Sequence, residues 1–143
     1  MRAWRICREP FGELSGEGAR LWGGRWKSLG RPLVYAADTA ALVVLEVRVH
    51  LDLSFDLLPA DSVLLTLELG RASLETVPAP PADTVAFGDA WLAAKRTAAL
   101  RVPSAIVAES ANILVNPRHP EAGQVRIADR RPVTSHERLW AGA

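Results

Sequence analysis

The chain has 143 residues, 49% of them hydrophobic and 23% charged, so it is long enough for one folded domain with its own core. Its 17 basic residues against 16 acidic residues leave a net charge of +1, which provides no field to attract a polyanion and argues against direct nucleic-acid binding. The single cysteine, Cys7, excludes an internal disulfide and a multi-cysteine zinc site, and this usage is typical of a cytoplasmic protein.

The first residues reach charged side chains and a proline before they accumulate the apolar run of a secretion signal. Glu46 interrupts the longest apolar run of the chain, which is too short to cross a bilayer. We therefore expect neither secretion nor a membrane-spanning helix.

The first half of the chain predicts a strand, a glycine-rich loop and a second, buried strand, at residues 4–7, 11–30 and 33–36. Asp38 and Thr39 then offer a side-chain oxygen to cap a helix. Residues 39–51 are ambiguous, since their first part is continuously apolar and their second part alternates. We favour a helix for the first part.

The second half predicts strands, loops and helices in alternation: a strand at 62–69, a short strand at 74–77, a proline-rich loop at 78–81, an amphipathic helix at 88–100, a strand at 102–109, a turn at 116–120, a last strand at 124–128 and a short helix at 134–140. No internal repeat and no linker divides the chain, so one domain over residues 1–143 is expected.

The stretch GGRWKSLGRPLVYAA, residues 23–37, mixes basic and aromatic side chains. The guanidinium of Arg25 suits a phosphate or carboxylate, and the preceding glycines would let a ligand approach the main chain; the alternative is a solvated arginine. Lys27 and Arg31 are expected to face solvent. Tyr35 offers a ring for stacking, although a tyrosine on an apolar strand is more often part of the core.

Glu46 stands out because it has apolar neighbours on both sides, and carboxylates are rarely buried without a partner. One interpretation is a functional carboxylate. The other is a helix face that turns Glu46 and His50, four residues apart, toward water.

Other polar residues carry weaker signals. Ser104, placed at the start of the predicted strand after Pro103, can bind a ligand or its own turn, and Asn112 and Asn116 can contact a substrate or cap a turn. One cysteine and three scattered histidines predict no metal site. The sequence contains no P-loop, no GxGxxG after a strand, no HExxH and no GxSxG.

Six short motifs taken in order resemble the RES domain family: GGRW at 23–26, VYAAD around Tyr35, LEVRVH around Glu46, GDAWL at 88–92, VPSAIV at 102–107 and NILVNPRHP at 112–120. The resemblance spans residues 4 to about 127. It implies an α+β fold similar to that of ADP-ribosyltransferases, with a mixed β-sheet core and flanking helices, and a helix that carries Glu46.

The resemblance also implies an activity and a site. RES proteins are toxins of type II toxin–antitoxin systems that consume NAD as a substrate, without a metal. Glu46 matches the catalytic glutamate, Arg25 the arginine near the NAD phosphates and ribose, and Tyr35 the tyrosine beside the nicotinamide. Ser104 matches the serine of the family name and Asn112 lies in the next motif, so both are expected to bind NAD.

Three functions remain open at this point. The first is cleavage of the nicotinamide–ribose bond with transfer of ADP-ribose to water or phosphate, which depletes NAD and arrests growth. The second is ADP-ribosylation of a cellular protein from the same site. The third is a non-catalytic module that binds a nucleotide or a partner. The resemblance further implies an Xre-type helix-turn-helix antitoxin that blocks the active site in a hetero-oligomer and carries the DNA binding.

Overall fold

The computed structural model describes residues 1–11, 13–16, 25–28, 30–50, 56, 58–134 and 136–141. Its strands are β1 (Arg2–Arg8), β2 (Val34–Ala37), β3 (Ser62–Glu68), β4 (Leu74–Thr76), β5 (Ala99–Pro103), β6 (Ala111–Val115) and β7 (Arg126–Pro132). Its α-helices are α2 (Ala40–His50) and α3 (Thr84–Ala94), and its 3-10 turns are η1 (Glu9–Phe11), η3 (Ala122–Gln124) and η4 (Glu137–Trp140).

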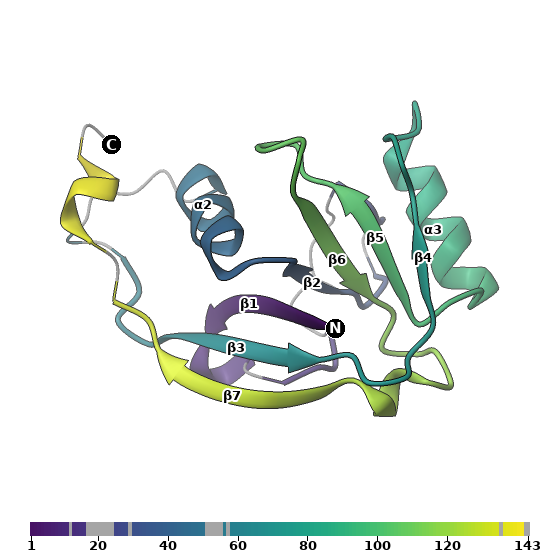
Figure 1. The fold of residues 1–143 in the computed structure, drawn as a ribbon, viewed down its shortest axis with the longest axis horizontal. Helices are drawn as coiled ribbons and strands as arrows, with labels where there is room; N and C mark the ends of the chain where they lie inside the picture. Colours follow the sequence, from purple (N-terminus) through teal and green to yellow (C-terminus); the bar gives the residue numbers. More distant parts are fainter. Residues whose placement is uncertain are drawn as a thin grey trace.

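The strands form one mixed seven-stranded sheet in the order β4-β5-β6-β2-β1-β3-β7 (Figure 1). β4 and β5 are parallel, and the other neighbouring pairs are antiparallel. The predicted α+β class, with a mixed sheet and flanking helices, is confirmed.

The sheet opens between β1 and β2. These strands share one paired position, Trp4 with Ala37, whereas β1 pairs with β3 at seven positions and β2 with β6 at four. Main-chain groups along most of this junction therefore have no ladder partner on the neighbouring strand. The gap divides the sheet into one half of β4, β5, β6 and β2 and another half of β1, β3 and β7.

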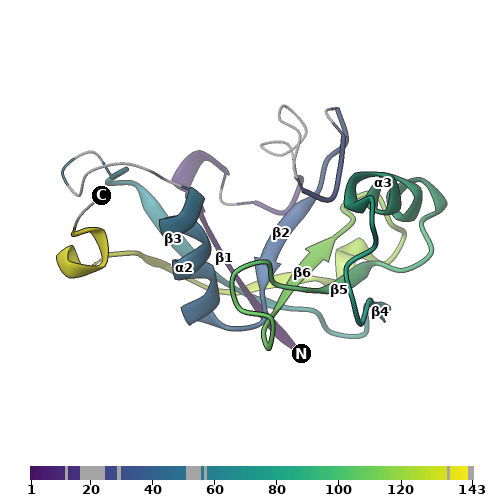
Figure 2. The ribbon, with the colours of Figure 1, turned by 90° about the horizontal axis from the view of Figure 1, so that it is seen from above.

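Each helix covers a different part of the sheet. Helix α2 packs on β1 and β2 beside the opening, over a cluster that includes Leu42, Val43 and Leu64. Helix α3 packs Trp91 and Leu92 against the other half of the sheet. Figure 2 shows the two helices apart from each other, with β2 and β6 between them.

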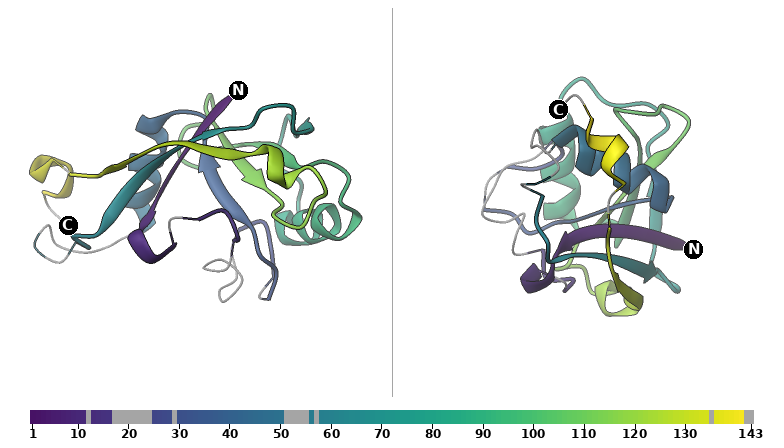
Figure 3. Two further views of the ribbon diagram at one scale, coloured as in Figure 1. Left: turned by 90° about the horizontal axis from the view of Figure 1, so that it is seen from below. Right: turned by 90° about the vertical axis from the view of Figure 1, so that its left-hand side faces the viewer.

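The C-terminal 3-10 turn η4 braces α2 from outside the sheet. It lies beside α2 in both views of Figure 3, where η4 is yellow and α2 blue. Arg48 of α2 donates from Nε to the carbonyl of Leu139 at 2.9 Å, and its guanidinium lies 5.2 Å from the centre of the Trp140 ring. The C-terminal turn is thus tied to the helix that carries Glu46.

Several sequence predictions are confirmed with small shifts in their ends, namely the strands expected at 4–7, 33–36, 62–69 and 74–77 and the turn at 116–120. Helix α2 continues to His50 rather than changing to a strand, and the hydroxyl of Thr39 accepts the amide N–H of Leu42 at 3.1 Å as the predicted cap. The ambiguous segment is thus a helix to its last described residue, since Leu51 lies outside the described residues.

Helix α3 corrects one prediction. The expected helix at 88–100 is displaced toward the N-terminus, because Asp83 accepts the amide N–H of Ala86 and starts the helix at Thr84. The helix ends at Lys95, whose φ of 50° is left-handed. The segment from Ala99 onward instead pairs with β4 and β6 as β5.

The expected strand at 102–109 is also wrong. Strand β5 ends at Pro103, and residues 104–110 form turns that lead into β6, which was not predicted. The last strand lies at Arg126–Pro132 rather than 124–128, and the expected C-terminal helix is the single 3-10 turn η4. The predicted loop at 11–30 includes residues 17–24, which lie outside the described residues.

No helix in the described ranges combines the length and apolar character that a membrane crossing requires.

Candidate active site

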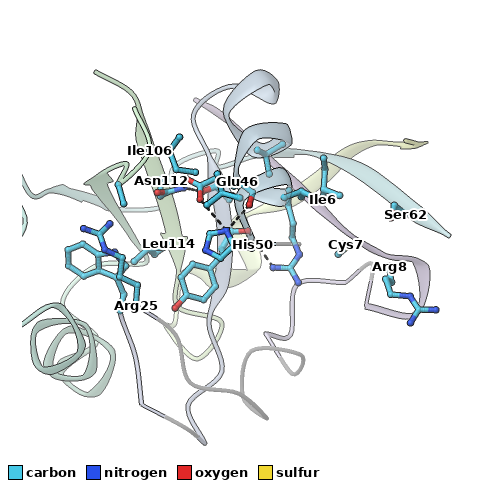
Figure 4. Close-up of a pocket in the computed structure, with 18 of the residues that line it drawn as sticks. Ile6, Cys7, Arg8, Arg25, Glu46, His50, Ser62, Ile106, Asn112 and Leu114 are labelled. Atoms are coloured by element: carbon cyan, nitrogen blue, oxygen red, sulfur yellow. Dashed lines mark hydrogen bonds and ion pairs between the residues drawn. The ribbon is translucent and has the colours of Figure 1, made fainter. Parts of the chain in front are cut away.

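A cavity of about 720 Å³ lies at the opening between β1 and β2, beneath α2 (Figure 4). Its volume is in the range of small-molecule and cofactor sites. Most of its wall is apolar, with a few charged groups: Arg5 and Arg8 from β1, Arg25 from the loop before β2, and Glu46 and His50 from α2. The opening in the sheet thus brings together residues that are far apart in the chain, from Arg5 to Leu114.

Glu46 projects from α2 into this cavity, with 20% of its side chain exposed. Its Oε1 accepts a hydrogen bond from Asn112 Nδ2 at 3.1 Å (Figure 4) and another from Ser104 Oγ at 3.3 Å. Two donors from other elements therefore fix one carboxylate oxygen, which offsets part of the cost of removing the charge from water.

His50 lies one helical turn after Glu46 and is exposed. Its Nδ1 is 2.6 Å from the carbonyl oxygen of Glu46, and because a carbonyl only accepts, Nδ1 carries the proton. The same Nδ1 is 3.8 Å from Glu46 Oε2. The second carboxylate oxygen, Oε2, thus faces His50 and the cavity, whereas Oε1 faces Asn112 and Ser104.

Ser104 sits just after the end of β5, not at the start of a strand as expected. It is 6% exposed, and its Oγ accepts the amide N–H groups of Ile106 and Val107 at 3.0 and 3.2 Å while it donates to Glu46. The hydroxyl therefore joins a turn to the carboxylate, and it is Ala105 and Ile106 that line the cavity.

Asn112 lies on β6 and does line the cavity. Its Nδ2 donates to the carbonyl of Ala36 on β2 at 3.4 Å as well as to Glu46. Asn116, which was considered together with it, is buried elsewhere and donates to the carbonyl of Leu92. The structure thus separates two asparagines that the sequence placed in one motif.

Arg25 is exposed at the edge of the cavity. Its guanidinium lies 5.6 Å from the centre of the Trp26 ring, in cation–π contact, and Trp26 itself is buried. The two glycines that precede Arg25 lie outside the described residues.

Tyr35 lies on β2, half-buried, with its ring on the cavity wall. Burial raises the pKa of its hydroxyl, the nearby main chain of Trp26 lowers the pKa in part, and the charge of Asp89 raises it further. The hydroxyl is buried and forms no hydrogen bond with any described residue.

Arg5 was not singled out from the sequence. It lies on β1 where the sheet opens, its Nη1 donates to the carbonyl of Tyr35 at 3.4 Å, and its buried Nε has no partner among the described residues. Strand β1 carries Arg2 and Arg8 as well, so no local sequence signal distinguishes Arg5 from the other arginines of the strand.

The prediction for Lys27 is wrong. Its side chain is 1% exposed, its Nζ donates to the carbonyl of Ser28 at 3.0 Å, and burial lowers its pKa although Asp89 opposes the change. Arg31 remains 43% exposed at its side chain and pairs with Asp89 at 3.4 Å. The basic residues of this stretch therefore have different environments.

The charges of the cavity favour an anionic ligand with a cationic centre. Arg8 is neutralised by two bonds to Asp61, at 2.9 and 3.1 Å, whereas no carboxylate among the described residues pairs with Arg5 or Arg25. Glu46, on α2, is the one carboxylate among the described residues that line the cavity. No group of three or more potential metal ligands occurs in the described part of the chain.

Comparisons with known proteins agree with one another. A family model described as "RES domain" matches residues 2–140. A Sphingobium protein named "Prs ADP-ribosylating toxin" is 39% identical over 141 residues, with 86% of each chain covered. A Pseudomonas putida protein named "Toxin Res" is 38% identical over 135 residues, with 89% of this chain and 92% of that chain covered.

A solved structure has a similar fold. The crystal structure of the M. tuberculosis MbcT–MbcA toxin–antitoxin complex contains a chain that matches with a TM-score of 0.73 at 20% sequence identity. The match covers 93% of this chain and 84% of that chain.

Proposed function

Because this chain belongs to the RES domain family, we propose that it is the toxin of a toxin–antitoxin system and that it cleaves the nicotinamide–ribose bond of NAD. The observation that carries the proposal is the carboxylate of Glu46, which is fixed by Asn112 and Ser104 at a cavity that also contains Arg5 and Arg25. A dinucleotide needs both features, since its pyrophosphate is anionic and its reacting ribose becomes cationic.

In the proposed reaction, the bond between C1′ of the ribose and the nicotinamide nitrogen breaks, and its electron pair leaves with nicotinamide. Nicotinamide is cationic in NAD and becomes neutral, so it needs no general acid. The ribose acquires oxocarbenium character, as in glycoside hydrolysis. Glu46 stabilises this positive charge, which exists mainly in the transition state.

Arg25 and Arg5 are proposed to contact the pyrophosphate, because they approach the cavity from a loop and from β1 and have no carboxylate partner among the described residues. Tyr35 would lie against the nicotinamide end and fix its orientation. Asn112 lines the cavity and can contact the ribose as well as Glu46. Ser104 reaches NAD only through Glu46 in this arrangement, so its expected role as an NAD ligand remains a prediction.

ADP-ribose is proposed to pass to water or phosphate, which adds at C1′ with loss of a proton. A protein acceptor is the second candidate, and it is favoured by the name of the Sphingobium relative, an ADP-ribosylating toxin. Both reactions share the same first step and the same carboxylate.

The proposed partner is an Xre-type helix-turn-helix antitoxin that covers the cavity in a hetero-oligomer and carries the DNA binding. The fold match to a chain of a toxin–antitoxin complex is compatible with this proposal. The proposed compartment is the cytoplasm, where the NAD pool is found.

Mass analysis of products tests the proposal. Purified protein is incubated with NAD in buffer, with added phosphate, and with cell lysate. Free nicotinamide in every arm supports bond cleavage, ADP-ribose or its phosphate identifies a small acceptor, and a protein that gains the mass of ADP-ribose identifies the second candidate. The proposal is overturned if NAD remains intact in all three arms, and the non-catalytic binding module then becomes the better interpretation.

A further inference from the structure

One face of α3 contacts the loop that carries Arg25. Thr84 Oγ1 donates to the carbonyl of Arg25 at 2.5 Å, and Asp89, five residues later, accepts the amide N–H of Ser28 at 2.8 Å. The hydroxyl of Ser28 donates to the second oxygen of the same carboxylate. Both ends of the described loop segment 25–28 are therefore tied to one helix.

Gly88 lies between these two anchors and allows the loop to approach the helix. A Cβ at this position would lie 1.6 Å from the carbonyl oxygen of Trp26, so no larger residue fits without displacement of the main chain. Trp26 also makes an edge contact with Phe87, with ring centroids 6.1 Å apart. The contact between loop and helix is thus a packed interface.

Asp89 takes part in several charge interactions at this interface. Besides Ser28 it pairs with Arg31 at 3.4 Å, and the buried Lys27 lies within its electrostatic reach. Burial raises the pKa of the Asp89 carboxyl, but the hydrogen bonds from Ser28 and the charges of Arg31 and Lys27 outweigh it and hold the pKa below its ordinary value. The carboxylate is therefore ionised at neutral pH.

We propose that Asp89 is a positioning residue for substrate binding: it fixes the loop 25–28 on α3 and so fixes where Arg25 meets the anionic part of the substrate. The inference rests on the proposed function, and it gives the GDAWL motif a role, since Gly88 and Asp89 of that motif are the residues in contact with the loop. Asp89 does not line the cavity, so it acts through Arg25 and not by contact with NAD.

Steady-state kinetics with NAD test this role. Asp89→Ala is expected to raise KM for NAD by about tenfold with a smaller change in kcat, because binding geometry is lost while Glu46 stays in place. Asp89→Asn keeps an oxygen that can accept from Ser28 and is expected to fall between wild type and Asp89→Ala. In the Arg25→Ala background, Asp89→Ala is expected to add little to the loss in kcat/KM, since the two changes remove one interaction.

Asp83→Ala is the matched control, because Asp83 caps the same helix and forms no hydrogen bond or ion pair with the described loop residues 25–28. It is expected to lower stability without changing KM. The proposal is overturned if Asp89→Ala leaves KM unchanged, if Asp83→Ala raises KM equally, or if the Asp89 and Arg25 losses multiply in the double variant.

Amide hydrogen exchange distinguishes a failure of this proposal from a failure of the proposed function. The amide of Ser28 is expected to lose protection in Asp89→Ala and to keep it in Asp83→Ala, with no substrate present. A wild-type protein that consumes no NAD would refute the proposed function, and the exchange of Ser28 would then decide alone whether Asp89 anchors the loop. Unchanged protection in Asp89→Ala refutes the anchor even if NAD is consumed.

Discussion

Asn112 and Ser104 reach the same oxygen of Glu46 from two different elements, so the carboxylate is held without a salt bridge to a basic side chain on that oxygen. Such an arrangement leaves the negative charge available to a substrate, whereas an arginine on the same atom would neutralise it. The two donors orient Oε1 and leave Oε2 directed toward His50 and the cavity. The carboxylate of Glu46 is therefore held in one orientation while its negative charge is not neutralised.

Asn112→Ala is expected to lower kcat for NAD cleavage by about 10- to 100-fold, since a hydrogen bond to a charged group contributes about 1.5–3 kcal/mol. Asn112→Asp keeps the shape but replaces the donor with a second negative charge, and it is expected to be at least as impaired. The measurement is kcat at saturating NAD for folded protein. Wild-type kcat in Asn112→Asp would show that Asn112 only fills space.

At the residue scale the sequence identified Glu46 because a charge among apolar neighbours needs an explanation. The same logic could not identify Arg5, because β1 carries three arginines and nothing local separates them, yet Arg5 proves to line the cavity. Lys27 was expected in solvent because most lysines are, and its burial depends on α3, which is about 60 positions away in the chain. Local composition carries no information about such a distant contact.

At the scale of elements, α3 shows how a local signal can be outweighed. The apolar spacing of residues 88–100 predicted a helix there, but the cap at Asp83 starts the helix earlier and the left-handed Lys95 ends it. Thr97 then accepts the indole N–H of Trp91 and donates to the carbonyl of Ala99, which turns the chain into β5. The strands expected at 102–109 and 124–128 differ from β5 and β7 for another reason, because pairing with neighbouring strands fixes where β5 and β7 end.

Lys95→Gly is expected to raise the free energy of unfolding by about 1 kcal/mol, because glycine adopts the left-handed conformation at a helix end without the steric penalty of a side chain. Lys95 does not line the cavity, so NAD cleavage is expected to stay at the wild-type rate. Urea unfolding followed by circular dichroism measures the change. A decrease in stability would mean that the conformation of Lys95 does not limit this helix end.

At the scale of the whole molecule, ion pairs and hydrogen bonds hold several carboxyl pKa values below their ordinary values. Arg8 does so for Asp61, Arg2 for Glu68, and Ser73 for Glu121, and Asp89 is held low by the bonds from Ser28 described above. A carboxyl whose pKa is lower in the folded state contributes stability above its unfolded pKa and loses it as pH falls through its folded pKa.

The free energy of unfolding is therefore expected to fall as pH decreases below the ordinary values, 4.5 for Glu and 3.8 for Asp. Urea midpoints measured from pH 7 to pH 3 test this, with Asp61→Asn as a variant that should show a shallower decline. A midpoint that is constant over this range would contradict the assigned pairs.

The order of the strands could not be predicted from the sequence at this scale. The fold class followed from the resemblance of six short motifs, but neither the neighbours of each strand nor the opening between β1 and β2 has a local signature. That opening is what brings Arg5, Tyr35 and Glu46 to one cavity. The motifs supplied the candidate residues, and the long-range pairing supplied their geometry.

The central claim is that Glu46 stabilises the cationic ribose during cleavage of NAD, and nicotinamide release by Glu46→Gln and Glu46→Ala tests it most directly. A preorganised electrostatic contact of this kind is worth about 10²- to 10³-fold in rate, so both variants are expected to lose at least that much while their circular dichroism and urea midpoint remain close to wild type. Glu75→Gln, which alters a glutamate paired with Arg96 outside the cavity, is the control and should keep full activity. Nicotinamide release by either folded Glu46 variant at the wild-type rate would contradict the claim.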